Sequence, residues 1–200
     1  MLKKCLGIAL LSIVLSMTSL AQQIGPDDAL QMRYAAHLDI ADSVVNMTNA
    51  GTSGGSLCAN LYTFDPAEEL ISCCTCTITP GALQSLSVLR SLTSNTLTFA
   101  IPTAVVVKIV ASSSGACNAA SITSDSLAPG LRAWATTIHQ SPTAATSYSI
   151  TETPFSTATL VAPELNHLTS YCGFIQAIGS GYGICQGCVT NGLGATTSTM

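Results

Sequence analysis

Charge is scarce along this chain, and positive charge is the scarcest. Charged residues make up 8% of the 200 residues, whereas ordinary globular domains contain about 25%. Only six residues are Lys or Arg, and apart from Lys3-Lys4 they are scattered. Nucleic-acid binding needs clustered cations that displace counterions from the phosphates. The composition therefore excludes nucleic acid as a partner and disfavours an anionic membrane surface.

The motifs of common active sites are also missing. The chain has no G-x-S-x-G elbow, no phosphate-binding loop and no calcium loop of spaced Asp residues. The adjacent acids Glu68 and Glu69 point apart and so do not form a glycosidase pair. The three histidines, which are His37, His139 and His167, are expected at the surface or at strand ends. We therefore expect a non-enzymatic protein without a cofactor or a metal.

Long apolar runs are lacking beyond the first residues. Lys3 and Lys4 precede an apolar stretch over 6–15, and small residues occupy Ser19 and Ala21. This pattern predicts a signal peptide over 1–21, cleaved before residue 22, and hence a secreted or periplasmic protein. An uncleaved anchor is the alternative, but the stretch is shorter than the roughly 20 residues that a bilayer requires. We expect no membrane span in the mature chain.

The predicted mature chain has 200 − 21 = 179 residues, which suits one domain with a real core. Its formal charge becomes −4 − 2 = −6 once Lys3 and Lys4 are removed. Ser and Thr fill about a quarter of the positions, and they give little charge repulsion between copies. The partner is unknown, and the composition favours self-association or a place at a cell surface or matrix.

Cysteine is the residue that the chain has in excess. Eight cysteines follow the predicted signal peptide, and an even count in an exported protein indicates disulfides. They are Cys58, Cys73, Cys74, Cys76, Cys117, Cys172, Cys185 and Cys188. A strand would hold Cys73 and Cys76 about 10 Å apart, which is too far for a disulfide.

We prefer a pairing in which Cys185 bonds Cys188 across a turn. Cys58, Cys117 and Cys172 then remain for the three clustered cysteines. The two CxxC elements also resemble halves of a zinc site, although more than a hundred residues separate them and an oxidising compartment disfavours thiolates. A thioredoxin-like site is disfavoured, because its CxxC would follow a strand and open a helix.

Alternating and β-branched segments predict six to eight short strands. They cover 32–40, 43–49, 56–64, 71–79, 83–88, 104–112, 131–139 and 148–153. Asp65-Pro66 suits either a hairpin turn or a helix start, and we prefer the hairpin. The segment 22–31 is expected to be an exposed lead-in, 32–192 a single domain, and 193–200 a disordered tail.

One helix is predicted over 163–178, with Pro163 in its first turn and Gly179 as its C-terminal cap. Cys172 lies on its apolar stripe and should bond to the sheet. Strands followed by one late helix predict a mainly β fold, an antiparallel β-sandwich with general immunoglobulin-like architecture, stapled by disulfides and carrying a C-terminal α-helix.

The run FDPAEELISCCTCTITP (64–80) and the close GSGYGICQGC (179–188) resemble a group of exported, Cys-rich proteins of environmental bacteria. No activity is established for that group. The resemblance implies a secreted single-domain protein and carries no catalytic residue across.

The leading hypothesis is a non-enzymatic structural, adhesive or surface-interaction protein. The first alternative is a glycan- or small-ligand-binding module, for which Tyr148, Phe155, Tyr171 and Tyr182 are candidate ligand-facing aromatics. The second alternative is a thiol-redox or metal-binding protein that uses the cysteine clusters.

Overall fold

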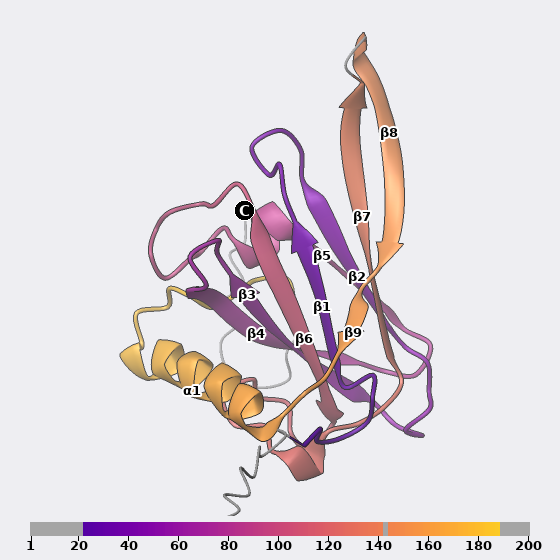
Figure 1. The fold of residues 1–200 in the computed structure, drawn as a ribbon, viewed down its shortest axis with the longest axis vertical. Coiled ribbons are helices and arrows are strands. Elements are labelled where there is room, and N and C mark those ends of the chain that lie inside the picture. Colours follow the sequence, from indigo (N-terminus) through magenta and orange to yellow (C-terminus); the bar gives the residue numbers. More distant parts are fainter. Residues whose placement is uncertain (1–21, 142–143, 189–200) are drawn as a thin grey trace, which may run out of the picture.

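The computed structural model describes residues 22–141 and 144–188, and it confirms the mainly β architecture. Two antiparallel sheets pack face to face (Figure 1). We call the sheet with strand order β4-β3-β6-β1-β9 the first sheet and the sheet with order β5-β2-β7-β8 the second. The elements are β1 (Leu30–Ala35), β2 (Ser43–Asn49), β3 (Leu57–Phe64), β4 (Leu70–Ile78), β5 (Leu83–Ser87), β6 (Val105–Ser113), β7 (Leu131–Ser141), β8 (Ala144–Pro154), β9 (Ser156–Ala158) and helix α1 (Ala162–Ile178). The predicted signal peptide and tail lie outside the described residues.

The core fills the space between the two sheets. Alternate residues of β3, such as Leu57 and Leu61, meet alternate residues of β7, such as Leu131 and Ala133. β6 lies between β3 and β1 and is buried on both faces, as its continuous apolar run predicts. This packed interior gives the site described below a rigid base.

The predicted strands are largely confirmed, and the hairpin at Asp65 is confirmed over the helix. The Asp65 carboxylate accepts hydrogen bonds from the backbone N–H groups of Ala67 and Glu69, which closes the turn between β3 and β4. Three boundaries were wrong. β8 begins at Ala144 instead of residue 148, because its pairing with β7 continues to Ser141. β1 ends at Ala35 instead of residue 40, because the chain turns at His37, whose φ is +58°. The lead-in is not exposed over Ala29–Gln31, since β1 begins there and buries those residues.

Helix α1 lies across the outer face of the first sheet (Figure 1). Its buried stripe includes Leu165, Leu168 and Cys172, which pack on side chains such as Tyr62. The helix ends at Gly179, which has the left-handed φ of +64° that a glycine cap tolerates. The predicted helix and its cap are therefore confirmed.

The chain switches sheets between β8 and β9. β8 pairs with β7 in the second sheet, whereas β9 pairs with β1 in the first. Phe155 stands at this corner and is buried in the core at 6% exposure. Gln31 of β1 links the two sheets. Its side-chain amide donates to the Leu131 carbonyl at 2.8 Å and accepts from the Ala133 N–H at 3.2 Å.

Candidate functional site

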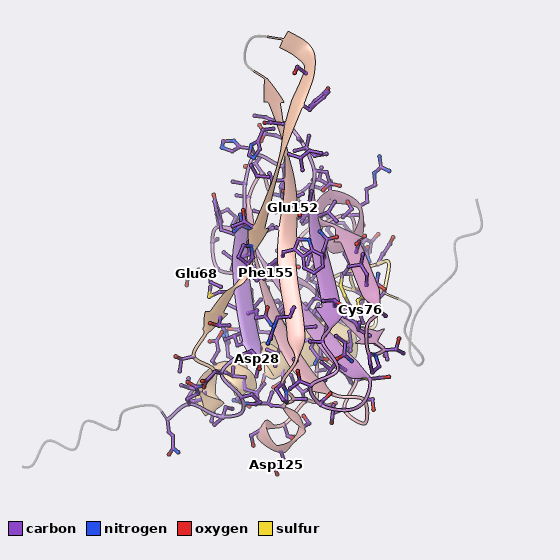
Figure 2. All side chains as sticks on the ribbon, turned by 90° about the vertical axis from the view of Figure 1, so that its right-hand side faces the viewer. Asp28, Glu68, Cys76, Asp125, Glu152 and Phe155 are labelled. Carbon is purple, nitrogen blue, oxygen red and sulfur yellow. A yellow bond between two sulfur atoms is a disulfide. The ribbon has the colours of Figure 1, made fainter. Side chains whose placement is uncertain are left out.

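The most prominent surface feature is the hairpin of β7 and β8, which projects beyond the sandwich (Figure 1). Figure 2 shows Glu152 higher on this hairpin than Phe155, which lies at the level of the body. The two strands pair from Trp134–Pro154 upward to Gln140–Tyr148. The hairpin therefore presents side chains on two faces that the sandwich leaves uncovered.

A row of polar side chains braces the hairpin's lower part on the outer face of the second sheet. Ser85 donates to the Asn46 amide oxygen at 2.6 Å, and the Asn46 amide donates to Thr136 at 2.9 Å. Thr136 in turn donates to the Glu152 carboxylate at 3.2 Å. The row connects all four strands of the sheet. It fixes the direction in which the hairpin leaves the body.

Large apolar side chains occupy the hairpin's outer face. Ala133 and Ala135 face the core, so the even-numbered residues of β7 face outward. Ile138 lies opposite Ile150 on that face, and Tyr148 follows two residues further along β8. Their exposed fractions are 38%, 65% and 60%. We call Ile138, Tyr148 and Ile150 the apolar stripe; exposed groups of this kind mark interaction surfaces more often than isolated ones do.

The opposite face of the hairpin borders a groove. This groove has a volume of about 370 Å³, at the lower end of the range for small-molecule sites. One wall is the end of β1 with the turn that follows it, including Arg33, His37 and Ile40. The other wall is the hairpin, including His139 and Thr151, whose side chains lie 2.8 Å apart between Nε2 and Oγ1.

The charge of this groove is unusual for so acidic a chain. Its lining includes Arg33, His37 and His139, but no Asp or Glu. Within the described residues Arg33 has no ion pair, whereas Arg132 pairs with Asp28 at 2.6 Å and Lys108 with Glu164 at 2.6 Å. The groove thus combines one permanent cation and two hydrogen-bonding rings with apolar walls.

The four candidate aromatics do not form one site. Tyr148 lies on the projecting hairpin, Tyr171 on α1 and Tyr182 after it, with exposed fractions of 60%, 49% and 41%. The hairpin tip and α1 occupy opposite ends of the molecule (Figure 1). The prediction that Phe155 faces a ligand was wrong. Phe155 continues the inward-facing alternation of β8 and is buried where the chain passes from one sheet to the other. Of the four, only Tyr148 belongs to the hairpin surface.

All eight predicted cysteines form disulfides, but the preferred pairing was wrong. The bonds are Cys58–Cys117, Cys73–Cys172, Cys74–Cys185 and Cys76–Cys188. Cys185 does not bond Cys188, because residues 183–185 return along the edge of β4. There the Cys73 N–H donates to the Gly183 carbonyl at 2.8 Å and the Cys185 N–H donates to the Cys73 carbonyl at 3.2 Å. The predicted link from Cys172 to the sheet is confirmed.

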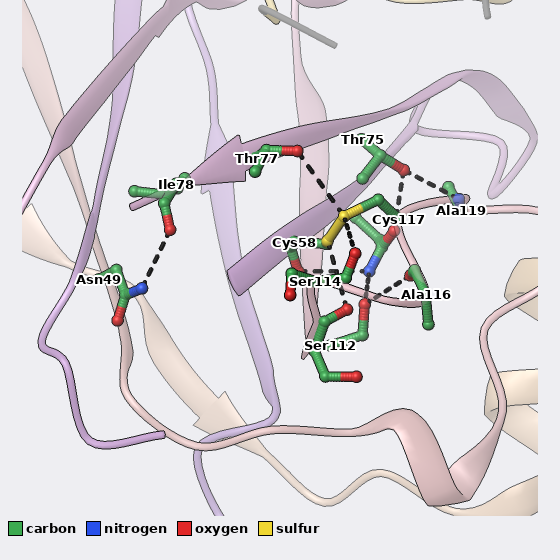
Figure 3. Close-up of a disulfide and its surroundings, with 12 residues drawn as sticks. Asn49, Cys58, Thr75, Thr77, Ile78, Ser112, Ser114, Ala116, Cys117 and Ala119 are labelled. Carbon is green, nitrogen blue, oxygen red and sulfur yellow. Dashed lines mark hydrogen bonds between the residues drawn. A yellow bond between two sulfur atoms is a disulfide. The ribbon is translucent and has the colours of Figure 1, made fainter. Parts of the chain in front are cut away.

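The remaining disulfide fastens the long loop after β6. Figure 3 shows Cys58–Cys117 beside Thr75, which accepts a hydrogen bond from the Ala119 N–H at 2.9 Å. The Tyr62 hydroxyl donates to the Ala119 carbonyl at 2.6 Å. Burial raises the pKa of this hydroxyl above its ordinary value of 10.0, since the phenolate would be desolvated. These contacts are structural and lie away from the hairpin.

The cysteine clusters therefore act as crosslinks in this structure. Four disulfides in one domain are typical of proteins that fold in an oxidising, extracytoplasmic environment. Within 22–141 and 144–188, no three His, Cys, Asp or Glu side chains are arranged to hold a metal ion. No helix in these ranges is long and apolar enough to span a membrane.

Sequence reasoning missed the groove, because no motif joins its two walls. Arg33 and His37 lie about a hundred positions before His139, and the two histidines were expected only at the surface or at strand ends. Comparisons with protein-family models, with curated proteins and with solved structures gave no match, so the geometry of the chain itself has to carry any argument about function.

Proposed function

We propose that this protein is a secreted, non-enzymatic surface-interaction module that contacts its target through the apolar stripe of the hairpin. The predicted signal peptide over 1–21 and the resemblance to exported proteins of environmental bacteria support its release from the cytoplasm. The observation that carries the proposal is the exposure of Ile138, Tyr148 and Ile150 on a hairpin that projects from the body.

The rest of the molecule supports a contact role for this hairpin. The core and four disulfides hold the sandwich rigid, and the polar row from Ser85 to Glu152 continues that rigidity into the hairpin base. A surface presented on a rigid scaffold loses little conformational entropy when it binds, which favours affinity. Tyr148 adds a large ring with a polar end, the combination that is enriched at protein interfaces.

The test compares two double variants of the full chain after export and oxidation. Tyr148→Thr with Ile150→Thr removes the stripe but keeps β-branched side chains in the strand. Tyr171→Gln with Phe174→Gln removes exposed apolar groups from α1 and serves as the control. Retention on cell envelopes and on insoluble polysaccharide is measured by cosedimentation.

We expect the hairpin variant to lose at least tenfold in retention and the α1 variant to match the wild type. Equal retention of all three proteins would show that the stripe is not the contact surface. Wild-type protein that is not retained on any of these surfaces would contradict the adhesive function itself.

A second candidate function is the binding of a small carboxylate that has an apolar body. The groove favours this class, because Arg33 can bind a carboxylate through a fork of two hydrogen bonds while Ile40 and Ala36 contact the apolar part. The absence of acidic residues from its lining leaves that cation available.

Calorimetric titration with octanoate and with octanol tests this candidate. We expect octanoate to bind and Arg33→Gln to weaken it about tenfold or more, in line with the loss of a charge-assisted pair. Arg90→Gln is the control, because Arg90 is an exposed arginine outside the groove. Equal binding of octanol, or no effect of Arg33→Gln, would exclude carboxylate recognition there.

A further inference from the structure

The outer edge of β8 is the longest open strand edge among the described residues. β8 is the last strand of its sheet and has 11 residues, whereas β9, the corresponding end of the first sheet, has three. The remaining edge of the first sheet, at β4, is covered by residues 183–185. Residues 147–152 of β8 are all exposed. An open edge of this kind is a template for pairing with another strand.

The backbone groups that face this open edge follow from the pairing with β7. The Phe155 N–H donates to the Ala133 carbonyl at 2.9 Å. Antiparallel ladders alternate, so the odd-numbered residues of β8 direct their backbone groups toward β7 and the even-numbered residues direct theirs outward. Pro154 agrees with this assignment, because a proline is tolerated in a strand where its missing N–H would face the open side. Tyr148, Ile150 and Glu152 therefore offer unpaired backbone groups.

We infer that β8 pairs antiparallel with β8 of a second copy of this chain, about a two-fold axis at Ser149. The sequence around this axis is self-complementary. Ser149 meets Ser149 of the second copy, Tyr148 meets Ile150, and Ser147 meets Thr151. A two-fold interface requires such reciprocal matching, and aromatic with β-branched residues is a favourable cross-strand pair.

The hydrogen-bonding groups match in the same register. With Ser149 on the axis, Tyr148 and Ile150 are opposed, and both have outward backbone groups. On the regular part of β8, these two reciprocal pairs exchange about four hydrogen bonds, at two bonds a pair. A shift by one residue would oppose outward groups with inward ones, so the backbone itself selects this register.

Charge also favours self-pairing. Glu152 is the only charged residue from Ala144 to Pro154, so in this register no charged residue of the second copy's β8 lies opposite it. Strands that avoid pairing usually carry a lysine or an inward-pointing charge near the middle of the open edge, and β8 has neither. The apolar stripes of the two copies would then lie on one continuous sheet. The inference rests on the strand edge and not on the proposed surface target.

Charge substitutions at Ser149 test the pairing. Ser149 is exposed and lies on the face opposite the apolar stripe. In Ser149→Lys or Ser149→Glu homodimers, like charges would stand directly opposite each other, which is destabilising. Sedimentation velocity of the full chain over a concentration series should show a wild-type dimer, monomers for each variant alone, and a dimer in their equimolar mixture.

A cysteine scan checks the register. Residues on the axis are non-hydrogen-bonded neighbours with Cα atoms about 4.5 Å apart, within the range that a disulfide spans. Ser149→Cys should therefore form a covalent dimer under mild oxidation. Ser147→Cys is the control, because the two copies of residue 147 would be about 13 Å apart at the strand rise of 3.3 Å per residue.

Three results would overturn the inference. They are a wild type that stays monomeric at every concentration, a dimer that Ser149→Lys leaves intact, and equal crosslinking of the two cysteine variants. Retention of a monomeric Ser149→Lys protein on its target surface would leave the proposed function standing, so the two failures can be distinguished.

Discussion

The order in which the disulfides contribute to stability should be the reverse of the order of their sequence separations. These separations are 59 residues for Cys58–Cys117, 99 for Cys73–Cys172 and 112 for Cys76–Cys188. In the chain-entropy account, a bond taken alone stabilises more when its loop is longer, up to about 4.7 kcal/mol for a 100-residue loop. The crosslinks of this protein do not act alone, however.

Neighbouring bonds shorten the loop that each further bond closes. When Cys74–Cys185 is intact, the loop that Cys73–Cys172 closes is short. It consists of residues 73–74 and 172–185, joined through the Cys74–Cys185 bond, which is about 16 residues. Cys76–Cys188 likewise closes a loop of about 7 residues, which consists of residues 74–76 and 185–188 joined through the same bond. Cys58–Cys117 has no shorter route and closes its full loop. The expected losses of unfolding free energy are about 4 kcal/mol for Cys58–Cys117, about 3 for Cys73–Cys172 and about 2 for Cys76–Cys188.

Urea unfolding of three paired Cys→Ala variants measures these losses. Intact mass before and after alkylation confirms that the other three bonds have formed in each variant. Losses that increase with sequence separation would refute the argument that adjacent bonds share one loop. A loss near 5 kcal/mol for the Cys76–Cys188 pair would refute it most directly.

Three further predictions concern single side chains. Thr63→Val should raise the free energy of unfolding by about 1 kcal/mol, measured by urea unfolding, because the buried Thr63 hydroxyl has no hydrogen-bond partner among the residues that the structure describes. Gly183→Ala should lower it by about 1–3 kcal/mol, since Gly183 has a φ of +77° and a Cβ there would lie 2.7 Å from Ile175 Cγ2. The raised pKa of Tyr62 adds stability that is complete below about pH 10 and is lost as the pH rises above it, so Tyr62→Phe should flatten the pH dependence of unfolding in that range. A variant that matched the wild type in its assay would contradict the corresponding reason.

Local sequence predicted the elements well, because local residues determine them. Alternation and β-branched residues delimit β2 at Ser43–Asn49, and a proline with a glycine cap delimits α1. The alternation of side chains along β8 would also have placed Phe155 correctly. Odd-numbered residues of β8 face inward, and Phe155, which directly follows the strand, continues this alternation, whereas Tyr148 faces outward.

Long-range features could not be predicted in the same way. The pairing of Cys74 with Cys185 depends on where residues 183–185 lie beside β4, and that position arises from backbone hydrogen bonds that any residue type can make. The groove likewise depends on the approach of His37 to His139 across two sheets. Neither of these two long-range contacts can be predicted from the spacing of residues along the chain.

The crosslink from β4 to the C-terminal segment also sets how the protein would respond to mechanical load. Between residues 22 and 188 the backbone has 188 − 22 = 166 steps, but the shortest covalent route has 76 − 22 = 54 steps and then passes through Cys76–Cys188. At about 3.5 Å per residue, a pulled molecule would extend to about 190 Å instead of about 580 Å. The hairpin of β7 and β8 lies in the bypassed stretch, so tension would not pass along its backbone, and the load would reach it only through the loss of its pairing with β2.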